Sequence, residues 1–225
     1  MNTPFFNTLL VIHIISGAIG FVVAPIALIV KKGSAAHKRW GKIFFAAMTG
    51  VATTAIIMAP MHHNQFLTFI AVFSYYLAFS GYRAVYRRRH SGGKPGWPDW
   101  TFVILDLAFS AFLFIFGLIN LPNPFGIISM AFGLIGFRLG MKDLSIFRNP
   151  IKKHDWLFSH IIGMVAAYIS AVSAFSAVNL NFPWIPAIVQ WLWPTIIGLP
   201  FIFRYISKLK KKLAAGNKVL PEFFE

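Results

Sequence analysis

The chain has 225 residues, of which 57% are hydrophobic, 17% are aromatic and only 12% are charged. Its mean hydropathy of +0.68 exceeds that of ordinary soluble domains, so the composition predicts an integral membrane protein. The chain contains no cysteine, which excludes disulfides, thiolate metal sites and cysteine nucleophiles.

Apolar segments separated by turn signals run along the whole chain. A bilayer core about 30 Å thick requires roughly 20 apolar residues per helix. We therefore expect an all-α, polytopic membrane protein, with a seven-transmembrane-helix bundle in residues 1–206 and a basic cytoplasmic tail in residues 207–225. Asn149 and Pro150 are expected to begin the sixth helix as N-cap and first residue. The expected helices lie at approximately 5–30, 35–61, 66–85, 100–120, 125–143, 150–178 and 188–206.

The positive charges predict the orientation of these helices. All 21 Lys and Arg residues lie in or beside the connections after the first, third and fifth segments, or in the C-terminal tail. The positive-inside rule then places the N-terminus outside and the C-terminus in the cytoplasm. The net charge of +15 is explained by contact with anionic lipid headgroups, so no nucleic-acid partner is expected. The sequence does not indicate a protein partner.

Three ionisable residues fall within the apolar segments at similar predicted depths. Asp106 and Arg138 are expected roughly 5 Å to the cytoplasmic side of the membrane midplane, and His160 about 10 Å. Such residues cost several kcal/mol in a bilayer and mark a pairing or a site. Three interpretations are open: a structural Asp106–Arg138 ion pair with His160 nearby, a proton-relay or ligand site open to the cytoplasm, or an unpaired Arg138 that reaches the interface.

The histidines are candidate cofactor or metal ligands. His13, His37, His63 and His160 could ligate a b-type haem, but both imidazoles must then approach one iron. The predicted depths of His13 and His63 differ by roughly 10 Å, and those of His37 and His160 by roughly 12 Å, which disfavours haem. Zinc and copper are disfavoured more strongly, since the adjacent His62 and His63 diverge on a regular helix. Met164 occupies the position at which an HxxxH pair would place its second histidine.

Small residues share helical faces with two of these histidines. Gly17 and Gly20 lie on the face of His13, and Gly163 lies on the face of His160. Such faces make room for a porphyrin edge, but they are also the usual packing surface between membrane helices. We therefore expect His13 to be a neutral imidazole that is hydrogen-bonded across a close helix contact. A glycine series in the fifth segment is expected to serve packing alone and comprises Gly126, Gly133, Gly136 and Gly140.

Two blocks of sequence resemble a known family. They are IHIISGAIGFVVAPIALIVKKGSAAHKRWGKIF, and HDWLFSHIIGMVAAYISAVSAFSAVN with the later WLWPTIIGLPFI. Together they are similar to the bacterial inner-membrane proteins catalogued as domain of unknown function 2306. The resemblance implies a multi-pass protein of the bacterial cytoplasmic membrane, and it directs attention to His13, His37 and His160. The family has no established activity, so it implies no reaction.

Three functional hypotheses follow from these patterns. The first is a membrane protein whose polar interior handles protons or a small ligand, built on Asp106, Arg138 and His160. The second is a b-type haem electron carrier. The third is a metal-dependent intramembrane hydrolase similar to the ceramidase and adiponectin-receptor group, whose zinc needs three ligands and a water. The sequence assigns no catalytic residue and does not decide whether the protein is an enzyme.

Overall fold

The computed structural model describes residues 3–149, 152–180, 182 and 184–215, and within these residues the chain forms seven helices and no strand. The expected all-α class is therefore confirmed. The helices are α1 (Pro4–Ile29), α2 (Ala35–Met61), α3 (Gln65–His90), α4 (Trp97–Ile119), α5 (Pro124–Arg148), α6 (Asp155–Asn179) and α7 (Ala187–Ala214).

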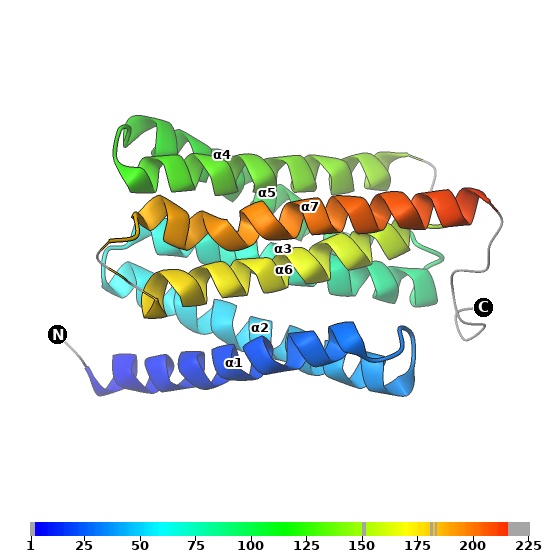
Figure 1. Cartoon of the computed structure of the whole chain (residues 1–225), viewed down its shortest axis with the longest axis horizontal. Coiled ribbons are helices and arrows are strands. Elements are labelled where there is room, and N and C mark those ends of the chain that lie inside the picture. The colour runs from blue at the N-terminus through cyan, green and yellow to red at the C-terminus, as the bar shows by residue number, and fades with distance from the viewer. Residues whose placement is uncertain (1–2, 150–151, 181, 183, 216–225) are drawn as a thin grey trace.

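The helices run side by side and alternate in direction, as Figure 1 shows. In the part of the chain that is described, six helices are long and apolar enough to cross a membrane. The remaining helix, α3, ends with Arg87, Arg88, Arg89 and His90 in its last turn. We call the end of the bundle with the α1–α2, α3–α4 and α5–α6 connections and the last turns of α7 the basic end. It is the end that the charge pattern predicts to be cytoplasmic.

Polar residues at the helix starts set several of the boundaries. The side chains of Thr3, Ser34 and Asn64 each accept a hydrogen bond from the backbone N–H three residues later. Each thereby satisfies a donor that the first turn of the helix leaves free. The sixth helix begins at Asp155, so the expected start at 150 is wrong. Asn149 instead ends α5, and Pro150 lies outside the described residues.

Several helices are longer than the apolar segments that predicted them. α3 continues to His90, α5 to Arg148 and α7 to Ala214, so the start of the predicted tail at 207 is helical. Charged residues in these last turns do not interrupt the helices, because Lys and Arg interact favourably with the negative end of the helix dipole. Apolar content therefore predicted the apolar part of each helix and not its full length.

Glycine contacts bring two helix pairs together closely. α3 packs chiefly on α6, and α4 packs chiefly on α5. A Cβ atom added at Gly163 would lie 2.7 Å from the backbone of Gly81, and one added at Gly126 would lie 2.8 Å from the carbonyl of Gly117. Backbone atoms cannot move aside easily, so these contacts require glycine. The tightly packed pairs hold the polar side chains of the interior in place.

Candidate functional sites

The first candidate site is a buried carboxyl cluster between α3, α4, α5 and α6. Asp106 on α4 is 1% exposed, and its Oδ2 has no hydrogen-bond partner. Ser110 donates to its Oδ1 at 3.3 Å. The carboxyl lies against Gly140 on α5, where an added Cβ would be 2.6 Å from Oδ2. Gly140 therefore does more than allow helix packing, because it leaves the space that the carboxyl occupies.

Of the three interpretations of these residues, the ion pair between Asp106 and Arg138 is wrong. Arg138 is exposed, and the only salt bridges among the described residues involve Asp99. The reason lies in the helical period. Gly136 and Gly140 face α4, and a residue two positions from each points about 200° away on an α-helix. Similar depth along the membrane normal was therefore insufficient, because Arg138 lies on the opposite side of α5.

Asp143 is the member of this cluster that sequence reasoning missed. It lies one turn beyond Gly140 and is 5% exposed. The hydroxyl of Tyr76 on α3 donates to Asp143 Oδ2 at 2.9 Å, and Ser159 on α6 donates to Oδ1 at 3.5 Å. The Asp106 and Asp143 carboxyls lie close enough to interact electrostatically. A signal was available in the sequence, since Gly136, Gly140 and Asp143 fall on one helical face.

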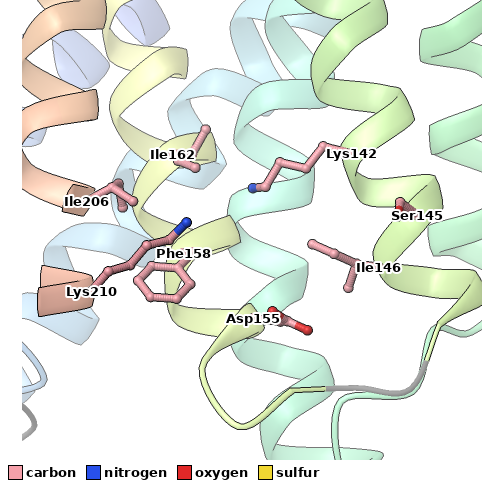
Figure 2. Close-up of a pocket in the computed structure, with 8 residues that line it drawn as sticks. All are labelled: Lys142, Ser145, Ile146, Asp155, Phe158, Ile162, Ile206 and Lys210. Atoms are coloured by element: carbon pink, nitrogen blue, oxygen red, sulfur yellow. The ribbon is translucent and has the colours of Figure 1, made fainter. Parts of the chain in front are cut away.

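Two hollows lie between this cluster and the basic end. A cavity of about 10 Å³, the size of a single water molecule, is lined by Ser80, Lys142, Asp143 and Ser159 among others. A larger pocket of about 270 Å³ lies beside it between α5, α6 and α7. Figure 2 shows the ammonium groups of Lys142 and Lys210 directed into this pocket from opposite sides. Lys142 and Ile162 line both hollows, so the pocket and the cavity are neighbours.

The second candidate site is a histidine pair. The imidazole of His37 on α2 and that of His160 on α6 are 6.1 Å apart between ring centres, and their planes are inclined by 85°. His37 Nδ1 lies 3.0 Å from the carbonyl oxygen of Ala27, and His160 Nδ1 lies 2.9 Å from that of Gly81. Both rings are half-buried near the basic end. The expected depth difference of roughly 12 Å between these histidines is wrong.

The error has a geometric cause. The predicted depths take the midpoint of each apolar segment as the membrane midplane, whereas the helices extend beyond these segments by different lengths. His37 is the third residue of α2 and His160 the sixth of α6, and both helices start at the basic end. Counted from these starts, the residues lie about 3 Å and 8 Å along their helices. Helix boundaries, which the sequence predicted least well, decided which histidines meet.

Lys32 lies beside the histidine pair. Its ammonium donates to the carbonyl oxygens of Ala27 and Leu28 at the end of α1, and it interacts electrostatically with both imidazoles. Partial burial lowers the pKa of Lys32 from its ordinary value. The pair is thus accompanied by a positive charge that is held on the same carbonyl group as His37.

His13 has the role that was expected of it. Its Nδ1 lies 2.9 Å from the hydroxyl oxygen of Thr54 and 3.2 Å from the carbonyl oxygen of Val51, both on α2. Gly20 packs against Ala47, Met48 and Phe44 at ordinary contact distances, and Gly17 faces Val51. The small-residue face of α1 is therefore a helix contact, and the prediction of an imidazole hydrogen-bonded across it is confirmed.

The remaining candidate ligands do not assemble around one point. His63 is exposed in the turn after α2, and the ring of His62 packs edge-on against Phe6. Met164 lies one turn beyond His160 and contacts the position of Gly81. Within the described residues, no group of three or more His, Cys, Asp or Glu side chains is placed to hold a metal ion.

An ion cluster at the basic end was also missed by the sequence analysis. Asp99 in the first turn of α4 accepts hydrogen bonds from Arg83 Nε at 3.0 Å, Arg83 Nη2 at 2.6 Å and Arg87 Nη1 at 2.6 Å. It also accepts from the backbone N–H of Gly96 at 2.9 Å. Arg83 and Arg87 are four residues apart and share a helical face, which is the pattern that could have revealed the cluster.

Comparison with known proteins yields no relative. No family model, curated protein or solved structure matches the chain.

Proposed function

We propose that the protein handles protons in the membrane, taking them up from its basic end into the carboxyl cluster of Asp106 and Asp143. The observation that carries this proposal is the burial of two carboxyl groups that form no salt bridge, with Lys142 and Arg87 acting on Asp143 only from a longer distance. Within the described residues, neither has a Lys, Arg or His nitrogen within 4.0 Å. An ionised carboxylate costs several kcal/mol in such a position, so the cluster is suited to holding a proton.

The arrangement of polar groups supports uptake from one end. The pocket beside Lys142 is open to the basic end, and the cavity behind it can hold one water between Ser159 and Asp143. Tyr76 then donates to Asp143 and also interacts electrostatically with Asp106. A proton can thus pass from the pocket through a water to Asp143, and from there toward Asp106. Arg138 and His160, which were expected to take part, lie outside this series.

The pocket supports a second candidate function, the binding of a small anionic ligand. Lys142 and Lys210 direct two ammonium groups into it, whereas Asp155 supplies one carboxylate. Its volume of about 270 Å³ is close to the lower end of the range for small-molecule sites. Phe158, Ile162 and Ile206 supply apolar walls. Retention of a small carboxylate or phosphate by the purified protein, lost in Lys142→Ala, would distinguish this function from proton uptake alone.

Infrared spectroscopy of the purified protein in lipid nanodiscs tests the proton proposal. We expect the carbonyl band of a protonated carboxyl group at neutral pH, with a shift on transfer to D₂O because the cluster is reachable from water. The band should weaken in Asp143→Asn and in Asp106→Asn. It should persist in Arg138→Gln, the matched control, because this arginine is exposed and distant from the series.

Two results would refute the proposal. One is a spectrum without a protonated-carboxyl band at neutral pH. The other is a band that both aspartate variants retain.

We also propose that the protein belongs to the family catalogued as domain of unknown function 2306. In this proposal it resides in the bacterial inner membrane, with its N-terminus outside. Six apolar helices support a multi-pass membrane protein. The distribution of Lys and Arg supports the orientation, which places the pocket at the cytoplasmic face. Proton uptake would then take place from the cytoplasm.

A further inference from the structure

We propose that the pocket between α5, α6 and α7 binds the headgroup of an anionic phospholipid, with its phosphate between Lys142 and Lys210. This proposal rests on the second candidate function, anion binding in the pocket, and names the source of the anion. The two ammonium groups are directed into the pocket from opposite sides, as Figure 2 shows. Within the described residues, neither of them lies within 4.0 Å of a carboxylate oxygen. Both are therefore available to share one anionic group.

The charge of the pocket matches that of a phosphodiester. The two lysines and the single carboxylate of Asp155 leave one positive charge in excess. A phosphodiester carries one negative charge, so a lipid whose headgroup is otherwise uncharged would neutralise the pocket. A zwitterionic lipid would add a cationic group at the basic end, in a chain where Lys and Arg already outnumber Asp and Glu. Basic pockets between membrane helices at the cytoplasmic side are typical sites for anionic headgroups.

Phe158 holds one of the two lysines in the pocket. The ammonium nitrogen of Lys210 lies 5.4 Å from the centre of the Phe158 ring, which is within the range of a cation–π interaction. An exposed lysine ordinarily extends into water, where its side chain keeps its rotational freedom. The contact with Phe158 limits that freedom before a ligand arrives. Binding of an anion to Lys210 therefore costs less side-chain entropy.

The order of polar and apolar residues in the pocket matches the order of groups in a phospholipid. α5 and α7 run toward the basic end and α6 starts there, so Asp155 and Lys210 lie nearer this end than Ile162 and Ile206. A pocket of about 270 Å³ can hold a headgroup, whereas acyl chains of ordinary length would extend beyond it. Apolar surface is present there, since Phe203 is 68% exposed and shares a helical face with Ile206 and Lys210.

Arg138 supports the presence of a lipid phosphate at this position. It lies one turn from Lys142 on the same side of α5, is exposed, and forms no salt bridge with a described residue. An arginine on the surface of a membrane-crossing helix is costly unless its guanidinium reaches headgroups or water. A phosphate bound by Lys142 would lie about 6 Å from the level of Arg138 along the helix axis. Arg138 would thereby gain an anionic neighbour at the protein surface.

Native mass spectrometry of the purified full chain in detergent tests the site. The chain is titrated with phosphatidylglycerol, and with phosphatidylcholine as the zwitterionic comparison. We expect one phosphatidylglycerol per chain to bind at least about 10-fold more tightly than phosphatidylcholine. Lys142→Gln and Lys210→Gln should each lower the affinity for phosphatidylglycerol at least about 10-fold, because each removes a charge-assisted contact with the phosphate.

Lys208→Gln is the matched control for these variants. It removes the same charge from the same turn of α7, but its side chain points about 200° away from that of Lys210 and does not line the pocket. We expect it to bind phosphatidylglycerol like the unchanged protein. Equal loss of binding in Lys208→Gln and in the two pocket variants would overturn the inference, because the lipid would then be attracted by the charge of the basic end as a whole.

Photo-crosslinking gives a readout that requires no variant to fold. A phosphatidylglycerol analogue with a photoreactive group beside its phosphate should label the unchanged protein within residues 142–146, 155–162 or 206–210. Labelling confined to other segments would overturn the inference.

Titration with inorganic phosphate distinguishes the lipid from a soluble ligand. Phosphate binding that depends on Lys142, together with phosphatidylglycerol binding that does not, would overturn the lipid assignment and support the second candidate function. If neither anion requires Lys142, both the lipid site and the second candidate function are wrong. The proton proposal is separate from these outcomes, because the infrared bands of Asp106 and Asp143 test it.

Discussion

Replacement of Asp99 with alanine is expected to destabilise the protein more than replacement of either arginine that it binds. The Asp99 side chain is 1% exposed, and that of Arg87 is 5% exposed. Each carboxylate oxygen of Asp99 accepts two hydrogen bonds. Removing the carboxylate leaves the Arg87 guanidinium buried without an anion, and loss of one partner of a buried ion pair costs about 3–5 kcal/mol.

The two arginine variants have smaller expected effects. In Arg83→Ala, Asp99 still binds Arg87 and the backbone of Gly96, and the Arg83 side chain is 17% exposed. We expect a cost of about 1 kcal/mol. In Arg87→Ala, Asp99 keeps the two-bond contact with Arg83, so the cost should be intermediate. The double variant Arg87→Ala, Asp99→Ala should be more stable than the sum of the single variants predicts, because neither charge remains unpaired.

Thermal unfolding in detergent, followed by circular dichroism, measures this order. For a chain of this size, 1 kcal/mol corresponds to roughly 2–4 °C in Tm, so Asp99→Ala should lower Tm by about 10 °C and Arg83→Ala by a few degrees. Equal shifts in these two variants would refute the reasoning, because they would mean that Arg87 does not depend on the carboxylate. Additive shifts in the double variant would refute the coupling between Arg87 and Asp99.

Three further predictions concern helix packing, the carboxyl cluster and the orientation. Gly163→Ala should lower the free energy of unfolding by about 1–3 kcal/mol, because its Cβ would meet the backbone of Gly81. Gly41→Ala is the control and should be neutral or slightly stabilising, because nothing lies within 4 Å of the added atom. Equal effects of the two variants on Tm would contradict the assigned contact. Tyr76→Phe should cost about 1–3 kcal/mol in the same assay, because Asp143 loses a buried donor; an unchanged Tm would show that this hydrogen bond adds no stability. The chain has no native cysteine, so single introduced cysteines can report which side of the membrane a loop is on. In intact cells a membrane-impermeant maleimide should label Gln65→Cys and should not label Lys94→Cys. The opposite labelling pattern would contradict the predicted orientation.

Hydropathy and charge predicted the helices well, because both are averages over many residues. The seven segments and their alternation required only that apolar runs of sufficient length be separated by turns. The sites required more exact information. Similar predicted depth allowed a pair between Arg138 and Asp106, although a rotation of about 200° around α5 separates Arg138 from the contact with α4. Asp143 was overlooked because it lies near a helix end, where a charged residue is expected to be solvated.

The histidines also show that sequence patterns predict local contacts better than contacts between distant helices. His13 could be interpreted correctly, because its neighbours Gly17 and Gly20 are local in sequence and indicate a close helix contact. His37 and His160 are brought together by helices that begin outside the apolar segments. An error of a few residues in a helix start changes depth by several ångströms. An error of this size is enough to place His37 and His160 at different predicted depths, although their side chains are neighbours in the protein.

The carbonyl oxygen of Ala27 mechanically couples the first helix to the histidine pair. It accepts from Lys32 and lies 3.0 Å from Nδ1 of His37, so the end of α1 and the start of α2 share one anchor. Most of the surface of α1 is not covered by other helices, since only Gly20, Val23 and Ala24 are buried. Bilayer thickness influences the tilt of a helix that is exposed in this way. A change in the tilt of α1 would therefore act on the carbonyl oxygen with which both Lys32 and His37 are hydrogen-bonded.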